Sequence, residues 1–329
     1  MAIKINVPAI LAFVMISIVF VSGCIQFPDT AKTEDMKVPH EGKYGIYMLD
    51  LDTGRVHSIY STGQEVYTSA LRLNDQCNKL VFTQKADGDS NEKNEIFTIN
   101  VDGTGLQRIT NNAFWDLYPA WSEDGSRIAF LSFRGKDLDI YMIDANGNNE
   151  ALFYDSGTHD ADIDWKNDNI VFTSGSAIWT IRDDGTGSTR VTSPPNAGLW
   201  GKANLPAGDY DPRLDPSGTK IVFERLENTS STHGNYNLFT INIDGSGEKR
   251  LTDTGYSQGL ASWSNSGDKI VYTVAAINDE GKYDAYMINS DGTDNRNITP
   301  SYFPPEFLVY SPIFSKDDTK IYFIGQWWE

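Results

Sequence analysis

Residues 118–130 read YPAWSEDGSRIAF, a stretch whose Trp, Ser, Glu and Asp side chains would suit an active site. Comparison of the chain with itself shows that the end of this stretch is repeated. A polar residue, aliphatic residues and an aromatic residue occur together six times, ending at Phe82, Phe130, Phe172, Phe223, Tyr272 and Phe323. These aromatic residues lie 42 to 51 residues apart, a spacing that indicates a repeat fold. The stretch is therefore expected to be structural.

A second apolar run follows in each unit, as in residues 95–100 (EIFTIN) and 139–144 (DIYMID), and it stands alone at residues 45–50 (GIYMLD). Asp-Gly pairs then lead into short segments that end in Ile-Thr, Val-Thr or Leu-Thr. Such runs indicate antiparallel hairpins, because the turns need positive φ values that Gly and Asp tolerate. No helical periodicity separates them. The sequence predicts an all-β chain that forms a six-bladed β-propeller of four-stranded antiparallel blades.

The two ends of the repeat region supply complementary half-blades. Residues 45–50 and 55–60 match the third and fourth strands of a unit, whereas residues 310–315 and 320–324 match the first and second. Pairing of these half-blades would complete one sheet and remove its exposed edges. We therefore expect the propeller to be closed by pairing of its N- and C-terminal strands.

The repeat resembles a known propeller family. Its pattern is Asp116-x-x-Pro119-x-Trp121-Ser122-x-Asp124-Gly125-x-x-Ile128-x-Phe130. This pattern is similar to the TolB-type (WD-like) β-propeller repeat, and the resemblance covers about residues 44–326. It implies the fold and names no activity. We expect no N-terminal α/β domain of the kind found in TolB itself, so the resemblance does not imply a Tol-Pal role.

The N-terminus has the features of a targeting segment. Lys4 precedes an apolar run over residues 8–21, and the segment ends in Val-Ser-Gly-Cys24. This ending resembles a lipobox, which predicts a lipoprotein signal peptide over residues 1–23 and lipidation of Cys24. The alternative is an uncleaved signal anchor with a chance cysteine.

A lipid on Cys24 would place the protein outside the cytoplasm, anchored to a membrane surface in the periplasm or at the cell surface. Polar, Pro-interrupted residues 24–43 would form a flexible tether, followed by the propeller at residues 44–329. Only Cys77 would remain as a free thiol, so the mature chain is expected to have no intramolecular disulfide.

Composition narrows the class of partner. The chain has 329 residues, 40% of them hydrophobic, with a formal net charge of −18. Lys and Arg are scattered, so a phosphate backbone would be repelled and nucleic acid is not an expected partner.

Candidate binding residues lie where the repeats differ. Long connections, at residues 85–94, 193–208, 227–236, 278–283 and 300–307, should all fall on one face of the disc. Alignment of the blades gives one equivalent position at the entrance to each inner strand: Thr68, Asp116, Asp160, Asp209, Gln258 and Val309.

Asp116, Asp160 and Asp209 would therefore ring the channel mouth, with Asp162, Asp211 and Glu306 close in sequence. Such a ring would favour a cation or a basic peptide. Alternatively, these Asp residues accept hydrogen bonds from backbone N–H groups in turns and link neighbouring blades.

Aromatic residues are the second group of candidates. Trp115, Trp200, Tyr302 and Phe303 lie in the long connections, where they would stack on a sugar, clasp a peptide or cap the hydrophobic ends of blades. Trp121, Trp165 and Trp263 occupy the repeat's core position and are assigned to packing.

Three other motifs point to chemistry only weakly. Residues 255–259 match G-x-S-x-G, but no helix follows to form a nucleophile elbow. Asp87, Asp89 and Asn91 are spaced like a calcium loop, although a solvated loop is favoured because the expected Glu is absent. His159 beside Asp160 and Asp162 is the only local group that would assist a metal.

Two hypotheses about function remain. The favoured one is a lipid-anchored, non-catalytic scaffold that binds an envelope protein, peptide or glycan through the variable loops, without a cofactor. The alternative is a lyase or hydrolase that acts on envelope or extracellular glycans with carboxylates at the channel mouth.

Overall fold

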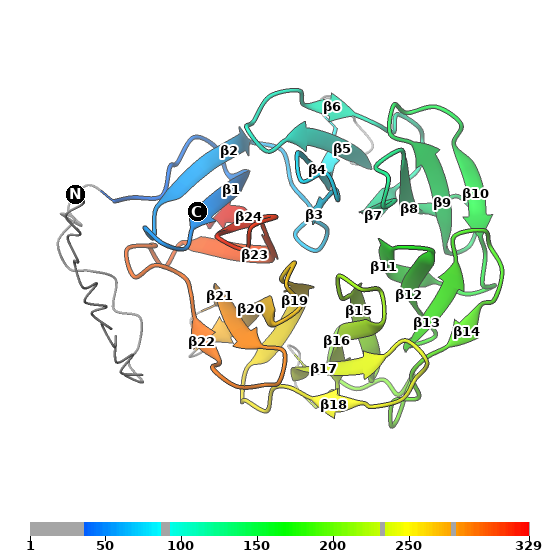
Figure 1. The fold of residues 1–329 in the computed structure, drawn as a ribbon. Helices are drawn as coiled ribbons and strands as arrows, with labels where there is room; N and C mark the ends of the chain where they lie inside the picture. The colour runs from blue at the N-terminus through cyan, green and yellow to red at the C-terminus, as the bar shows by residue number, and fades with distance from the viewer. Residues whose placement is uncertain (1–35, 87–92, 231–233, 278–280, 329) are drawn as a thin grey trace, which may run out of the picture. The chain divides into compact units, whose positions relative to one another are not determined.

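The computed structural model describes residues 36–86, 93–230, 234–277 and 281–328, and all regular structure in these ranges is β-strand. Six four-stranded sheets stand as blades around a common centre (Figure 1). This arrangement confirms the predicted all-β, six-bladed propeller. Within the same ranges, no helix is long and apolar enough to cross a membrane. The predicted signal peptide, residues 1–23, and the predicted lipidation site Cys24 lie outside the described residues.

Five blades are each built from four consecutive strands, of which the first is innermost. Blade 1 has β3 (Arg72–Leu73), β4 (Lys79–Lys85), β5 (Asn94–Asn100) and β6 (Gln107–Arg108). Blade 2 has β7 (Asp116–Trp121), β8 (Arg127–Phe133), β9 (Leu138–Asp144) and β10 (Ala151–Tyr154). Blade 3 has β11 (Asp160–Lys166), β12 (Asn169–Ser174), β13 (Ala177–Arg182) and β14 (Thr189–Arg190). Blade 4 has β15 (Gly208–Leu214), β16 (Lys220–Leu226), β17 (Tyr236–Asn242) and β18 (Lys249–Arg250). Blade 5 has β19 (Ser257–Trp263), β20 (Lys269–Ile277), β21 (Lys282–Asn289) and β22 (Arg296–Asn297).

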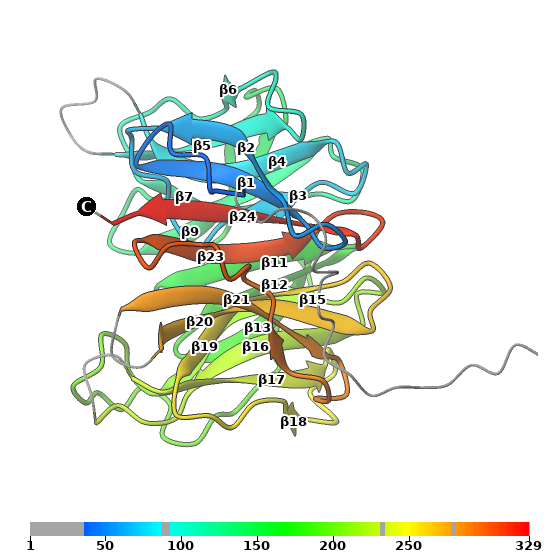
Figure 2. The same ribbon diagram turned by 90° about the vertical axis from the view of Figure 1, so that its left-hand side faces the viewer.

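Blade 6 joins the two ends of the chain. Its strands, from inside to outside, are β23 (Phe307–Phe314), β24 (Lys320–Trp327), β1 (Tyr44–Asp50) and β2 (Val56–Thr62). β1 and β24 pair antiparallel along their length, from Tyr44 opposite Gln326 to Asp50 opposite Lys320, and lie side by side in Figure 2. The predicted closure by two half-blades is confirmed, and it leaves neither β1 nor β24 with an unpaired edge.

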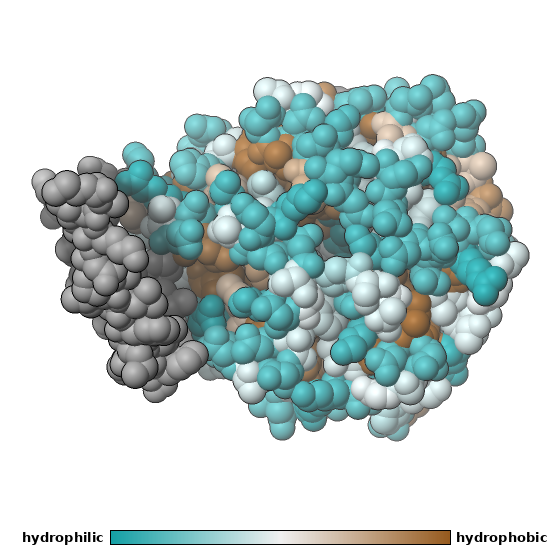
Figure 3. Space-filling view, in the orientation of Figure 1, coloured by the Kyte–Doolittle hydropathy of each residue, from teal (hydrophilic) through white to brown (hydrophobic). Residues whose placement is uncertain are grey.

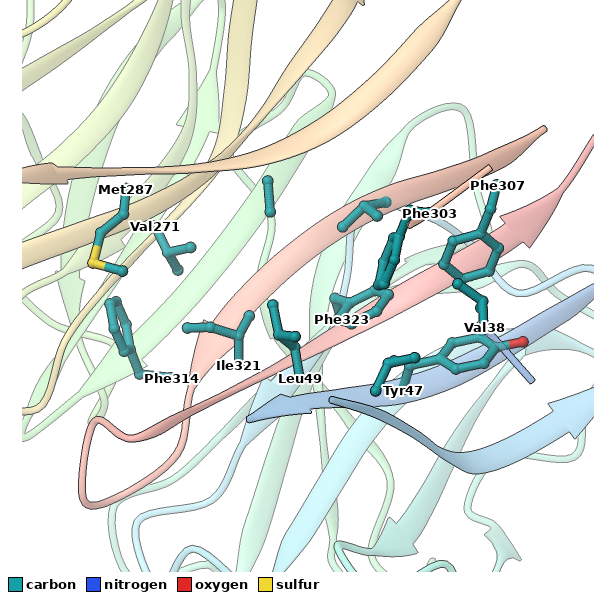
Figure 4. Packing of buried hydrophobic residues seen from close by; sticks show 13 residues of the cluster. Val38, Tyr47, Leu49, Val271, Met287, Phe303, Phe307, Phe314, Ile321 and Phe323 are labelled. Atoms are coloured by element: carbon teal, nitrogen blue, oxygen red, sulfur yellow. The ribbon is translucent and has the colours of Figure 1, made fainter. Parts of the chain in front are cut away.

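The core lies between neighbouring blades, because both faces of most strands are buried. The aromatic residues that end the repeated runs are all buried, including Phe82, Phe130 and Phe172 at 0% exposure. Between blades 5 and 6, Val271 and Met287 face Phe314 and Ile321 (Figure 4). The repeat tryptophans Trp121, Trp165 and Trp263 are 5–8% exposed, in agreement with the predicted packing role.

The Asp-Gly turns depend on glycine. At the turn between β5 and β6, Gly103 has a φ of +85°, and a Cβ built there would lie 2.6 Å from the carbonyl oxygen of Ile59 in β2. The neighbouring Asp102 accepts hydrogen bonds from the amide and hydroxyl of Thr104. The turn therefore satisfies its own polar groups and also touches the next blade.

Each inner strand of blades 2–6 contains a bulge that the sequence did not reveal. The pairing register shifts in all five strands, next to a residue with a positive φ of 46–54°. These residues are Tyr118, Asp162, Asp211, Leu260 and Ser311. A bulge redirects the side chains of a strand, so equivalent residues are re-aimed in the same way in five blades.

The segment before β1 is partly packed. Val38 is 5% exposed within the core of blades 5 and 6, and the ring of His40 stacks on Trp327 with centroids 4.0 Å apart. Tyr47 donates a hydrogen bond to the carbonyl of Pro39 over 3.3 Å. The packed unit thus includes Val38 and His40, which had been expected to belong to the flexible tether over residues 24–43.

Candidate functional site

In the described residues, the connections that differ between blades lie on the face of the ring where the inner strands begin; we call it the variable-loop face. The opposite face carries the short turns between first and second strands and is called the tight-hairpin face. In Figure 2 the hairpin that joins β23 and β24 lies at the end opposite the C-terminus. The two faces offer different side chains.

Asp116, Asp160 and Asp209 do occupy one equivalent position. They lie opposite Ser132, Ser174 and Arg225 in the second strand of their blades. However, all three are 0% exposed, so the expectation of a carboxylate ring open at the channel mouth is corrected. The contacts of Asp116 and Asp160 match the linking role that was weighed as the alternative.

Each of these carboxylates has dedicated donors. Asp116 accepts hydrogen bonds from Ser132 Oγ at 2.6 Å and from Asn112 Nδ2 at 2.7 Å. Asp160 accepts one from Ser156 Oγ at 2.6 Å. Because Asn112 and Ser156 belong to the connections from the preceding blades, these bonds fasten one blade to the next. The donors are mainly side chains, whereas backbone amides had been expected.

Asp209 is held differently. Arg225 forms two bonds to it, Nε to Oδ1 at 2.5 Å and Nη2 to Oδ2 at 3.0 Å, and also binds Glu248. This fork geometry suits a carboxylate, so the buried charge of Asp209 is balanced.

Burial changes the acidity of these groups. It raises the pKa of Asp116 and that of Asp160 from 3.8 to about 6, although hydrogen bonds from Ser132 and Ser156 oppose the rise. It also raises the pKa of Asp209, against the effect of Arg225. In all three residues the largest cause is burial, because removal of water disfavours the charged carboxylate.

Four further charged groups gather at the channel. Asp162 accepts a hydrogen bond from the amide of Asp211 at 3.2 Å, and Arg213 binds Asp211 at 2.5 Å. Burial, with the charges of Asp211 and Asp162 next in importance, raises the pKa of Glu224 well above its usual value. Sequence reasoning noted Asp162 and Asp211 but missed Glu224 and Arg213. The signal available was Glu224 itself, a charged residue inside the apolar run IVFER.

An aromatic pocket lies near the start of β7. Trp115, Phe114 and Phe133 are 52%, 36% and 40% exposed and, with Lys93 and Ala113, line a cavity of about 440 Å³. We call this site the aromatic pocket. Trp115 was a predicted binding residue, whereas Phe133 was missed because it ends the strand RIAFLSF and resembles a core residue.

Neighbouring side chains fix the walls of the aromatic pocket. The Arg134 guanidinium lies 5.0 Å from the ring centre of Phe114 and 4.1 Å from that of Tyr141. Phe133 stacks on His159 with centroids 6.2 Å apart. Phe114 and Phe133 are therefore held by neighbouring side chains, and the pocket lies between the start of β7 and the end of β8.

The other predicted aromatic residues do not join this pocket. Trp200 is 70% exposed in the connection before β15 and does not line the cavity. Phe303 is 5% exposed, and Tyr302 donates a hydrogen bond to the carbonyl of Gly54 at 2.8 Å. These two residues cap blade ends, the last of the three roles considered for them.

The remaining motifs are placed as follows. Residues 257–259 of the G-x-S-x-G motif are the first residues of β19, which pairs with β20, so the motif does not form a strand-to-helix turn. His159 Nδ1 accepts a hydrogen bond from the amide of Leu138. In the described part of the chain, no group of three His, Cys, Asp or Glu side chains is arranged to hold a metal. The calcium candidates Asp87, Asp89 and Asn91 lie outside the described residues. Glu306 is exposed at the end of the connection before β23.

Comparison with known proteins bears on the family. Residues 37–196 match the model of the TolB beta propeller domain. A "Protein TolB homolog" of Chlorobium luteolum is 29% identical over 161 residues, which are 47% of this chain and 33% of that protein. An uncharacterized protein, Atu1656 of Agrobacterium fabrum, is 26% identical over 192 residues, 55% of this chain and 61% of that protein. The chain thus matches less than two thirds of either relative.

A solved structure gives the same fold. A protein from Agrobacterium tumefaciens, described as a candidate TolB, superimposes with a TM-score of 0.65 at 15% identity, covering 87% of this chain and 99% of that one. At this identity the likeness concerns the fold alone.

Proposed function

We propose that this TolB-like β-propeller is an exported, lipid-anchored binding scaffold that holds a protein or peptide partner at the cell envelope through its aromatic pocket. The observation that carries this proposal is the gathering of Phe114, Trp115 and Phe133 around one cavity. Exposed apolar side chains that cluster at a concave site are the usual anchors of recognition surfaces. The TolB-like family supports a scaffold role at the envelope, and the lipobox supports the anchor.

Pre-arranged side chains make the aromatic pocket suited to binding. Arg134 is held by stacking on Phe114 and Tyr141 and by an ion pair with Glu150. Side chains that are already held in place lose little conformational entropy when a partner binds, so less of the free energy of apolar contact is offset. A glycan that stacks on Trp115 is the alternative ligand.

Capture of partners from native membranes tests this proposal. We expect a protein that co-purifies with the full-length chain to be lost from the double variant Trp115→Ala/Phe133→Ala. Leu152→Ala is a matched control, because Leu152 is also 52% exposed but lies on the outermost strand of blade 2. Equal capture by the double variant and wild type would exclude the pocket. Capture of polysaccharide in place of protein would establish the glycan alternative.

The anchor is tested separately. Cells supplied with labelled palmitate should incorporate it into wild type and not into Cys24→Ser, and the variant should leave the membrane fraction. Labelling of the variant at the same level would contradict the lipid anchor at Cys24.

A further inference from the structure

The tight-hairpin face has a second cavity, distinct from the aromatic pocket. It measures about 140 Å³, and the ends of the inner strands of five blades contribute to its wall, among them β3, β11 and β15. Figure 3 shows this face, which is mostly hydrophilic and hollowed near its centre. The cavity therefore lies where these inner strands end.

The lining of this cavity is unusual for a chain with a net charge of −18. Three cationic side chains, Arg72, Lys166 and Arg213, line it together with two carboxylates, Asp75 and Asp164. Both carboxylates already have partners: Lys166 binds Asp75 at 2.5 Å, and the amide of Leu214 donates to Asp164 at 2.9 Å.

The two guanidinium groups differ in how they are satisfied. Arg213 donates to the carbonyl of Pro212 at 2.6 Å and to Asp211 at 2.5 Å. Arg72 is 8% exposed and donates from Nη1 to the carbonyl of Leu71 at 2.8 Å. Its Nε and Nη2 are buried without a hydrogen-bond acceptor, and the nearest carboxylate oxygen, on Asp164, is 3.4 Å from Nε.

An unmet buried donor is costly, by about 1–3 kcal/mol for each group. The guanidinium stays charged and its planar fork matches the two oxygens of a carboxylate or oxoanion. Burial, and then the positive charge of Arg213, lowers the pKa of Arg72 to about 10. The carboxylates Asp164, Asp211 and Asp162 oppose this fall in the pKa and do not cancel it.

We propose that Arg72, supported by the positive charge of Arg213, binds a small anion with a carboxylate or oxoanion group in this cavity. In this proposal the anion accepts two parallel hydrogen bonds from the Nε–Nη2 edge of the guanidinium, whose two nitrogens lack an acceptor. A volume of about 140 Å³ equals the liquid volume of only a few water molecules, which fits an acetate- or phosphate-sized group. The same carboxylate chemistry is offered by a free anion and by the C-terminus of a peptide.

Thermal unfolding of the full-length protein at constant ionic strength tests the site. Sodium acetate and sodium phosphate are compared with sodium chloride, whose anion has no carboxylate or oxoanion group. We expect acetate or phosphate to raise the Tm saturably in wild type, as a ligand of the folded state does. In Arg72→Gln the dissociation constant should rise about tenfold or more, because a charge-assisted pair of hydrogen bonds is lost.

Arg225→Gln is the matched control, since Arg225 is 6% exposed and bound to Asp209 away from the cavity. It should keep the anion effect even if its Tm is lower. If Arg72→Gln does not fold, calorimetric titration of wild type with acetate decides alone. A tripeptide with a free C-terminus, compared with its amide, distinguishes the two sources: binding of the acid form only identifies a chain terminus.

Absence of saturable binding of acetate, phosphate and the peptide acid to wild type would overturn the proposal. So would equal binding by folded Arg72→Gln. Both outcomes are independent of the aromatic pocket, which lies at the other face.

Discussion

At the scale of single residues, the sequence predicted which side chains are equivalent, whereas their burial depends on the surrounding structure. Asp116, Asp160 and Asp209 could be predicted to share one position, because the repeat aligns them. Their burial could not be predicted, since it depends on which connection folds over each strand. Trp115 and Trp200 both lie in long connections, yet Trp115 lines the aromatic pocket and Trp200 does not.

Asp160→Asn should stabilise the protein above neutral pH. Because the folded pKa of about 6 exceeds the ordinary 3.8, this carboxyl favours folding most below pH 4, and that contribution is lost as pH rises through 6. Asparagine can still accept from Ser156 without a charge to desolvate. We expect a gain of about 1–2 kcal/mol at pH 8 and little gain at pH 4, measured by urea unfolding.

Asp124→Asn is the control of opposite sign. Hydrogen bonds from Ser126 and Ser122 lower the pKa of this turn residue to about 2. Its stabilising effect is present above pH 4 and is lost as pH falls through 2, so the variant should be less stable at pH 8. Loss of stability in Asp160→Asn at pH 8 would contradict the assignment of Asp160 as an unbalanced buried charge.

Asp209→Asn should have the reverse effect of Asp160→Asn. It removes the charge that faces Arg225, which is 6% exposed, and leaves that guanidinium with Glu248 alone. Breaking one side of a buried pair costs about 3 kcal/mol, so the urea midpoint should fall at pH 8. An unchanged midpoint would show that Glu248 balances Arg225 by itself.

At the scale of elements, the strands and hairpins could be predicted, whereas the bulges could not. Short apolar runs followed by Asp-Gly turns predict strands and hairpins locally, and this pattern recurs along the chain. The bulge residues Tyr118, Asp162, Asp211, Leu260 and Ser311 share a positive φ and no chemical feature. The bulges depend on how the inner strands pack together, so the sequence of one strand does not predict them.

Gly103→Ala should destabilise blade 1 and its contact with β2. The alanine would have to adopt a φ of +85°, and its Cβ would lie 2.6 Å from the Ile59 carbonyl oxygen. We expect a loss of about 1–3 kcal/mol in urea unfolding. Gly135→Ala, where nothing lies within 4 Å of the added carbon, should change stability little. Equal effects in the two variants would refute the steric explanation.

At the scale of the whole molecule, blade count and ring closure could be predicted from the phase of the repeat. The aromatic pocket was only half predicted, because it combines residues from a connection, a strand end and the neighbouring blade. The cavity around Arg72 could not be found, since five blades contribute to it and no segment carries its pattern.

Deletion of residues 44–62 should abolish cooperative thermal unfolding. It removes β1 and β2, exposes the edge of β24 and opens the ring between blades 6 and 1. Calorimetry should then give a broad transition in place of a single peak. Insertion of Gly-Ser after Gly135, in the short connection between β8 and β9, is a control that should keep the single peak. A sharp transition in the deletion variant would mean that five blades suffice.

The pairing of β1 with β24 also sets an order of events in time. Residues 44–50 reach their partners only when residues 320–326 have been synthesised. Contacts between such distant segments form slowly, because a long loop has to close first. The first strand therefore waits for the last, and the ring stays unfinished throughout translation.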